Sequence, residues 1–587
     1  MSRLRRMCER RRNCIAGSPL LLPAVARRFV MHSRPATLLV LLAVALAALA
    51  VRCPRLAQRP MHGDEAVQCD IFRKLWETGQ YRYDPEEYHG PTLPYATWPV
   101  MWLSGARTFE NSTEHTYRAV ALIFGLLLIL MLPLVADGLG TTGTIIAAVL
   151  TAASPAMIFF SRYYIHEMLL VVFTFGAIAC AWRFYRGGGI WWAAMAGAFV
   201  GLMHATKETW VLAAAAATAA LVLASLWGRV ADGRPADPGR AVRLCGARIA
   251  AAATMAALAA IVVAVVLFSS FFTHLRGPLD SVLTYKVYFQ RGTGEGVHNH
   301  PWYAYLKWFF WYRYGRAPVQ GEWLVAAAAL AGLACALWPR RRSSASSPAA
   351  QAPRNAAATP AADGHSQDAQ TSFCRFMAFY ALALTAVYSA VSYKTPWCAL
   401  SFLHAMILLG ACGIDMVWNA LRRPWLRALP ALALAGGLVH LGHLAYRLNY
   451  VHYADYRRNP MVYGHPNLSS LELVKRVDEI MRVSPAGADT FVSVITKDCW
   501  PLPWYFRRYR RVGWWQEVAP ENVAAPVILT MHDKAAQVNA MLRGEYQVMH
   551  YGLRPGVPMA LFVRMDLWER YLRSRGLIQP QTDRSRL

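Results

Sequence analysis

Side chains that could do chemistry gather in short polar stretches between long apolar runs. One stretch, MHGDEAVQ, places two adjacent acids, Asp64 and Glu65, shortly after His62. A carboxylate can deprotonate a hydroxyl as a general base, and arginine or lysine can bind a phosphate. The other members of this set are His89, Arg162, His166, Glu167, Lys207, Glu208, Tyr393 and Lys394. Together these residue types suit a substrate that carries both a phosphate and a sugar.

Each group also has a simpler interpretation when it is taken alone. An Asp-Glu pair is common at the start of a helix, where acids favour the helix dipole. Arg162 could contact lipid headgroups, Lys207 and Glu208 could form a local pair, and the histidines could be structural. Charged residues beside apolar helices, however, usually face a cavity or one another. The location of all these groups on one side of the apolar runs therefore favours a shared cavity.

The apolar runs set the class of protein. The chain has 587 residues, of which 56% are hydrophobic and 16% are charged, with a net charge of +27. This composition excludes a largely disordered chain and a single soluble domain. The basic residues punctuate the apolar runs instead of clustering on one module, so nucleic acid is not an expected partner.

A helix needs about 17–25 apolar residues to cross the hydrocarbon core of a bilayer. About eleven segments meet or approach this requirement, so the sequence predicts a polytopic α-helical membrane protein that has the lipid bilayer as a partner. The predicted spans are 36–51, 118–136, 142–160, 168–185, 190–205, 209–227, 249–272, 323–338, 373–391, 397–418 and 428–446.

The arginine-rich loops predict the orientation of these spans. Basic loops stay on the cytoplasmic side, and the alternate loops that carry most of the arginines share one side with the N-terminus. The polar stretches with candidate site residues then fall on the opposite side. We therefore expect a multi-pass protein of the inner (cytoplasmic) membrane, with its active face and its C-terminal domain extracytoplasmic.

The C-terminal part of the chain has a different composition. The segments 490–495, 526–531 and 559–565 read as strands, and 471–481 and 533–542 read as helices, which predicts a small α/β domain. The expected parts are a basic cytoplasmic tail at 1–35, a transmembrane domain at 36–446 with extracytoplasmic loops at 52–117 and 273–322 and a flexible cytoplasmic linker at 339–372, and the α/β domain at 447–587.

The ordered set of MHGDEAVQ, YHGPTLPY, SRYYIHE, ATKET, HNHPWYAYL and YKTPWC resembles the GT-C superfamily of membrane glycosyltransferases. This superfamily includes protein O-mannosyltransferases (the glycosyltransferase 39 type) and aminoarabinose transferases. The resemblance covers roughly residues 37–450 and is closest to a bacterial and archaeal branch of flippase-activity-associated membrane proteins. It implies a GT-C-like helical fold and transfer of a sugar from a polyprenyl-phosphate donor to an extracytoplasmic acceptor in cell-envelope glycosylation.

The resemblance also assigns roles to residues. Asp64 matches the catalytic acid, with Glu65 beside it, Glu167 matches the second-loop acid, and Arg162 matches a donor-phosphate contact. We add His62, His89, His166, Lys207, Glu208, Tyr393 and Lys394 as substrate-binding candidates by their location. The resemblance leaves the need for a cofactor open, because some members use a divalent metal between two loop acids and others use none. If Mg²⁺ or Mn²⁺ is bound, Asp64 and Glu167, with His166, are the residues that could supply ligands.

Two functions therefore remain open. The first is a hexosyltransferase in which Asp64 is the general base and the acceptor is a glycan, a lipid or a protein. The alternative is a lipid-linked sugar flippase, or a flippase-associated subunit of cell-surface polysaccharide assembly, which needs the phosphate contacts but no general base.

Overall fold

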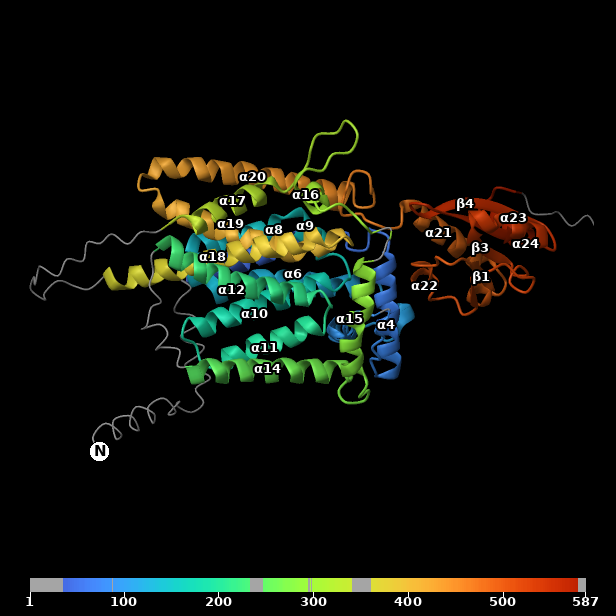
Figure 1. Ribbon diagram of the computed structural model, residues 1–587. Helices are drawn as coiled ribbons and strands as arrows, with labels where there is room; N and C mark the ends of the chain where they lie inside the picture. Colours follow the sequence, from blue (N-terminus) through green and yellow to red (C-terminus); the bar gives the residue numbers. More distant parts are fainter. Residues whose placement is uncertain are drawn as a thin grey trace, which may run out of the picture.

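The computed structural model describes residues 35–86, 88–232, 246–293, 296, 298–339 and 360–578. The basic tail expected at 1–35 lies outside these residues except for Pro35, and so does most of the linker expected at 339–372. Within the described ranges the chain forms a long bundle of helices, followed by a small domain that contains a sheet (Figure 1).

Eight helical segments of the described chain are long and apolar enough to cross a membrane. They are Pro35–Arg52 (α3), Glu114–Leu139 (α6, η2 and α7), Glu167–Tyr185 (α10), Trp210–Asp232 (α12), Gly246–Phe268 (α14), Gln367–Ala390 (in α18), Pro396–Ala420 (η3 and α19) and Pro424–Val451 (η4, α20 and η5). The other three predicted spans contain shorter helices, Thr141–Ala153 (α8), Trp191–His204 (α11) and Trp323–Leu337 (α17). Every predicted span therefore coincides with helix, and the described chain is a multi-pass helical bundle.

One predicted span is interrupted. The segment expected at 142–160 divides into α8 and a short second helix, Pro155–Phe160 (α9). Pro155 has no N–H to donate, and the Ser154 side chain caps the new helix by accepting from the Met157 N–H at 3.3 Å. Proline at the first position of a helix is favourable there and breaks the preceding helix.

A second difference concerns the expected linker. Residues 360–372 are helical and form the first turns of α18, Pro360–Ala390. Its Gln370 donates to the Asp415 carboxylate at 2.7 Å and to the Leu139 carbonyl at 3.1 Å, so these turns are joined to the bundle.

Short helices cover the end of the bundle nearest the C-terminal domain. They are Gly63–Thr78 (α4), Thr92–Leu103 (α5), Gly277–Thr293 (α15) and Ala304–Phe310 (α16), with a 3₁₀ turn at Phe109–Asn111 (η1). Figure 1 shows α4 and α15 lying across the direction of the bundle helices. These elements come from the two long loops of the sequence prediction, and they hold most of the candidate site.

The C-terminal domain contains a five-stranded mixed sheet in the order β2-β1-β3-β5-β4. Its strands are Val492–Ile495 (β1), Val512–Trp515 (β2), Val527–Met531 (β3), Tyr546–Arg554 (β4) and Val557–Arg564 (β5). β1 is parallel to β2 and β3, with Val494 opposite Leu529, whereas β5 is antiparallel to β3 and β4. The helices are Leu468–Val483 (α21), Leu502–Tyr505 (α22), Ala535–Met541 (α23) and Met565–Ser574 (α24).

This domain confirms the predicted α/β class. The buried strands β1, β3 and β5 and the helices α21 and α23 coincide with the five predicted elements. The two edge strands, β2 and β4, and the two helices α22 and α24 were not predicted. β2 has only four residues, VGWW, and is only partly buried. It therefore lacks the longer continuous apolar run by which a central strand is recognised in a sequence.

Candidate active site

The two adjacent acids lie at the start of α4. His62 precedes the helix, and its Nδ1 accepts the Asp64 N–H at 2.9 Å. Glu65 completes a capping box, because its Oε2 accepts the His62 N–H at 3.0 Å. The reciprocal bonds satisfy two N–H groups at the helix start. They also fix the directions in which the side chains leave the first turn.

Glu65 belongs to a buried ion pair with Arg118 of α6. The Arg118 Nε donates to one carboxylate oxygen at 2.8 Å and Nη2 to the other at 2.7 Å, and both side chains have 0% exposure. The Tyr164 N–H donates to Glu65 Oε1 at 2.9 Å. Burial alone would raise the pKa of Glu65, but the Arg118 charge and hydrogen bonds hold that pKa well below its usual range.

The contacts of Glu65 do not fit the catalytic role that we expected for it. Both of its oxygens accept hydrogen bonds from the protein, and no surface of the side chain is open to a substrate. A general base must reach the proton that it removes. The geometry instead gives Glu65 a structural role, in which it joins α4 to α6 and to the loop before α10.

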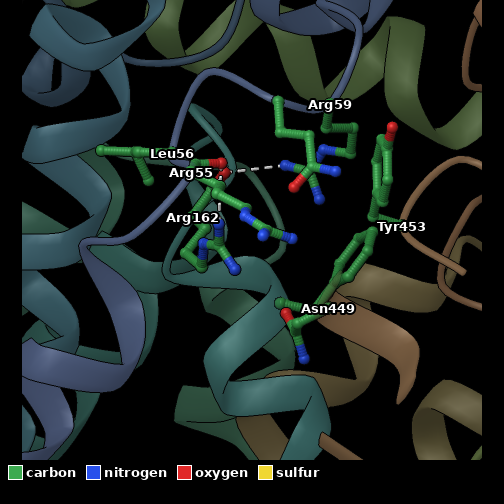
Figure 2. A pocket seen from close by; sticks show the side chains of 8 residues that line it. Arg55, Leu56, Arg59, Arg162, Asn449 and Tyr453 are labelled. Atoms are coloured by element: carbon green, nitrogen blue, oxygen red, sulfur yellow. Dashed lines mark hydrogen bonds between the residues drawn. The ribbon is translucent and has the colours of Figure 1, made fainter. Parts of the chain in front are cut away.

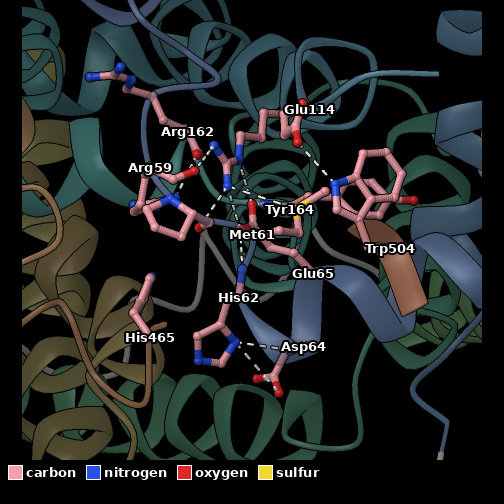
Figure 3. Close-up of polar contacts among 12 residues, drawn as sticks. Arg59, Met61, His62, Asp64, Glu65, Glu114, Arg162, Tyr164, His465 and Trp504 are labelled. Atoms are coloured by element: carbon pink, nitrogen blue, oxygen red, sulfur yellow. Dashed lines mark hydrogen bonds and ion pairs between the residues drawn. The ribbon is translucent and has the colours of Figure 1, made fainter. Parts of the chain in front are cut away.

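Asp64 is the opposite case. Its side chain is 55% exposed, and its only ion-pair partner among the described residues is His62, at 3.8 Å between Nδ1 and Oδ1. Figure 3 shows the Asp64 carboxylate beside the His62 ring, with the Glu65 side chain directed away from it. Asp64 is therefore the acid of the pair that a substrate can reach.

Histidines and tyrosines from distant parts of the chain meet near this acid. The Tyr463 hydroxyl bonds to His298 Nδ1 and to His300 Nε2, both at 2.9 Å. The Tyr463 carbonyl lies 3.2 Å from His62 Nε2, and the His62 and His465 rings lie 4.6 Å apart. Burial lowers the pKa of His298, and the negative charge of Asp64 opposes this shift.

The polar stretch YKTPWC, which contains Tyr393 and Lys394, joins the same cluster. The Lys394 N–H donates to the His298 carbonyl at 2.9 Å, and Lys394 Nζ donates to the His300 carbonyl at 3.2 Å. The ring of Tyr393 lies 4.9 Å from that of His298. The structure therefore brings four predicted site residues together, namely His62, Asp64, Tyr393 and Lys394.

Five other predicted residues form a second group that is largely paired within itself. Lys207 forms an ion pair with Glu167, and both side chains are buried. His89 Nδ1 lies 2.8 Å from Glu208 Oε2, and the His89 ring is 5.1 Å from that of His166. Burial would raise the pKa of Glu208, but His89 lowers it below its usual value. These pairs join the three polar stretches YHGPTLPY, SRYYIHE and ATKET and leave little charge for a substrate.

Arg162 lies elsewhere. Its Nη2 donates to the carbonyls of Pro54 and Arg55 at 2.8 and 3.0 Å, and its guanidinium stacks 4.7 Å from the ring centre of Tyr450. Figure 3 shows this side chain directed away from Asp64. It lines a separate pocket with Arg55 and Arg59 (Figure 2). The donor-phosphate contact expected of Arg162 is therefore not part of the cluster around Asp64.

The residues expected to hold a metal do not fit one. Glu167 is paired with Lys207, whereas Asp64 contacts His62 at the start of α4. Within the described ranges, three or more His, Cys, Asp or Glu side chains nowhere come together in a group that could hold a metal ion.

Several residues of this region were not among those predicted from the sequence. Arg118 was counted inside a predicted span, although an arginine in an apolar segment is itself a signal of a buried partner. His298 and His300 stand in the motif HNHPWYAYL, where their i, i+2 spacing was visible. Tyr463 and His465 follow the last span and carried no local signal.

The roles of the two acids can be separated by matched substitutions. Glu65→Gln leaves Arg118 as a buried charge without its counter-ion, which should lower the stability by about 3–5 kcal/mol. Asp64→Asn should change it by less than about 0.5 kcal/mol, because that side chain is exposed. Thermal unfolding of the purified full-length variants measures both. Equal melting temperatures for the two variants would contradict the structural role of Glu65.

The bundle and its capping loops can be compared with known proteins. A family model described as dolichyl-phosphate-mannose-protein mannosyltransferase matches residues 96–276. No curated protein sequence matches the chain.

Two solved structures of ArnT from Cupriavidus metallidurans are similar in fold. The apo structure has a TM-score of 0.56 at 14% identity and covers 92% of this chain and 99% of its own. The structure bound to undecaprenyl phosphate has a TM-score of 0.57 at 15% identity and covers 90% and 98%. The chain therefore shares the fold of ArnT over most of its length, and both the fold and the family model agree with the resemblance seen in the sequence.

Proposed function

We propose that this protein is a membrane glycosyltransferase that moves a sugar from a polyprenyl-phosphate donor to a hydroxyl of an acceptor. The observation that carries the proposal is the division between the two acids of α4. Glu65 is held in a buried pair with Arg118, while Asp64 is exposed beside a cluster of histidines, tyrosines and Lys394. An exposed, positioned carboxylate is what a general base requires.

The reaction follows from this arrangement. The acceptor hydroxyl loses its proton to the Asp64 carboxylate as its oxygen forms a bond to the anomeric carbon. The bond between that carbon and the donor phosphate oxygen breaks, and its electron pair leaves with the polyprenyl phosphate. Attack from the side opposite the leaving group inverts the anomeric configuration. Lys394 is the cation of this cluster, but it is 1% exposed and its ammonium donates to the carbonyls of Val391 and His300. An ammonium has three donors, and we assign the third to stabilise the charge on the departing phosphate once the substrate opens a path to it.

Aromatic rings near Asp64 suit a sugar. The ring of Trp397 lies 5.8 Å from those of His62 and Tyr163 and 6.0 Å from that of Tyr463. Aromatic side chains with a polar group provide an apolar face together with a hydrogen-bonding edge. The donor class is supported by the name of the matching family model, and by the undecaprenyl phosphate bound to an ArnT of similar fold. The acceptor is a glycan, a lipid or a protein.

The alternative function is a flippase for lipid-linked sugars, or a subunit that assists one. It would use the same cationic and aromatic residues but would not need Asp64 as a base. Two features favour the transferase: the exposed acid, and the family model named for a mannosyltransferase.

Substitution of Asp64 separates the two functions. Asp64→Asn keeps the shape and removes the base, so sugar transfer from polyprenyl-phosphate sugars should fall about 10²–10⁴-fold while donor binding persists. Asp70→Asn is the matched control, because Asp70 lies on the same helix but pairs with Arg73. Lys394→Ala should weaken donor binding in either model. Full transfer by Asp64→Asn, with export of lipid-linked sugar abolished by Lys394→Ala, would favour the flippase.

We further propose that the cluster and the C-terminal domain face the extracytoplasmic side of the inner membrane. The support is the distribution of basic residues, because arginine-rich loops lie at the opposite ends of the spans. Alkaline phosphatase fused after residue 587 should then be active, and a green fluorescent protein in the same place should be dark. A fluorescent, phosphatase-inactive pair of fusions would reverse the orientation.

A further inference from the structure

The pocket that Arg162 lines lies at the same end of the bundle as the cluster around Asp64. The loop that precedes α4 lies between the pocket and that cluster. The pocket is lined by Arg55, Arg59, Arg162, Phe159, Asn449 and Tyr453, among others. Figure 2 shows the three arginine side chains around one opening, with Tyr453 and Asn449 facing them. None of the residues that line this pocket is acidic.

The charges around this pocket are not balanced by the protein. Arg59 and Arg162 are only 7% and 6% exposed, and the hydrogen bonds of their guanidinium groups go to backbone carbonyls. Arg52 is fully buried behind them and bonds to Ser161 Oγ and to carbonyls such as that of Thr151. The nearby Glu65 is already paired with Arg118. Buried charges without a counter-ion are costly, so the site is incomplete without an anion.

The hydrogen-bonding groups of the pocket point to the same conclusion. The Nε atoms of both Arg59 and Arg162 are buried and have no hydrogen-bond partner in the described structure. Burial lowers the pKa of Arg59 to about 9, and the Arg118 charge adds to that effect. An anion in the pocket would accept hydrogen bonds from these donors. Its negative charge would also offset the cost of burying the charged guanidinium groups.

The pocket also lies at a particular depth. Arg52 is the last residue of the first candidate span, and Asn449 lies in the final turn of the last one, Pro424–Val451. The Tyr450 hydroxyl donates to the Val51 carbonyl, which joins the ends of these two spans. Span ends lie at the boundary between hydrocarbon and headgroups, where lipid phosphates are found and where tyrosine and arginine side chains are common.

A wall of side chains separates this pocket from Asp64. Arg59 stacks on Phe159 and Tyr163, with 4.3 and 5.0 Å from its guanidinium carbon to the ring centres. The Tyr163 ring in turn lies 5.4 Å from the His62 ring, and His62 contacts Asp64.

Arg55, an exposed residue that lines the pocket, has a left-handed backbone with φ of 51°. A residue other than glycine adopts this conformation only under constraint.

We propose that this arginine pocket binds the phosphate group of a membrane lipid, between the ends of the first and last spans and apart from the cluster around Asp64. The ligand is a phosphate ester presented at headgroup depth. Two lipids carry this chemistry there, a polyprenyl phosphate and a bilayer phospholipid. The site does not depend on the sugar-transfer reaction, because none of its residues contacts Asp64.

The test uses full-length protein in nanodiscs and measures binding of two probes, undecaprenyl phosphate and the anionic phospholipid phosphatidylglycerol. Arg55→Asn is the first variant, since asparagine tolerates a left-handed backbone and Arg55 is exposed. Arg162→Gln is the second and removes a buried guanidinium. Arg457→Gln is the control, an exposed arginine that follows the same last span.

Loss of one charge-assisted contact should weaken binding of the preferred probe about tenfold or more in both pocket variants and not in the control. If undecaprenyl phosphate is the probe affected, the pocket holds the polyprenyl lipid. If phosphatidylglycerol is affected, the pocket is a headgroup site. Unchanged binding of both probes in a folded Arg55→Asn variant and a folded Arg162→Gln variant would overturn the proposal. Asp64→Asn should leave this binding intact, so failure of the transferase proposal would be seen separately.

Discussion

The buried ion pair between Glu65 and Arg118 is the constraint on which the candidate site depends. A buried pair is weak evidence for stability, since the cost of removing two charges from water can cancel their attraction. Its effect here is geometric. Arg118 bonds to Glu65 and also to the carbonyls of Leu56 and Arg59 at 2.8 and 3.0 Å, so one guanidinium holds both the first turn of α4 and the loop before it.

That constraint explains how two adjacent acids take different roles. Successive residues of a helix point about 100° apart, so Glu65 can reach the buried arginine only if Asp64 points elsewhere. The result is one acid with 0% and one with 55% side-chain exposure. The same loop separates two regions of opposite character. On one side lie Asp64 and the ring cluster around Tyr463, and on the other lies the pocket with unbalanced arginines.

Much of the fold could be predicted from the sequence, because apolar length and period are local properties. All eleven predicted spans coincide with helices, and the buried strands of the C-terminal domain were found for the same reason. The errors have local causes too. Pro155 divides one span, and the edge strand Val512–Trp515 lacks a fully buried face.

The site was only partly predictable, because its contacts join residues far apart in the chain. Asp64, His62, Tyr393 and Lys394 were expected to share a cavity and do lie around one cluster. The partner of Glu65 is 53 residues away and the partners of Tyr463 are more than 160 residues away, so no spacing in the sequence reveals them. Arg162 carried a correct residue type for phosphate, but the side chain leaves its loop on the opposite side from Asp64.

The most direct test of the account is an experimental structure of the full-length protein with a polyprenyl-phosphate sugar bound. We expect the anomeric carbon to lie next to Asp64, separated from its carboxylate by about the space of one acceptor hydroxyl at hydrogen-bond distances. The Glu65–Arg118 pair should be unchanged by the substrate. A sugar bound out of reach of Asp64, or one that contacts Glu65 after displacing Arg118, would contradict the central claim that Asp64 is the working acid and Glu65 the residue that positions it.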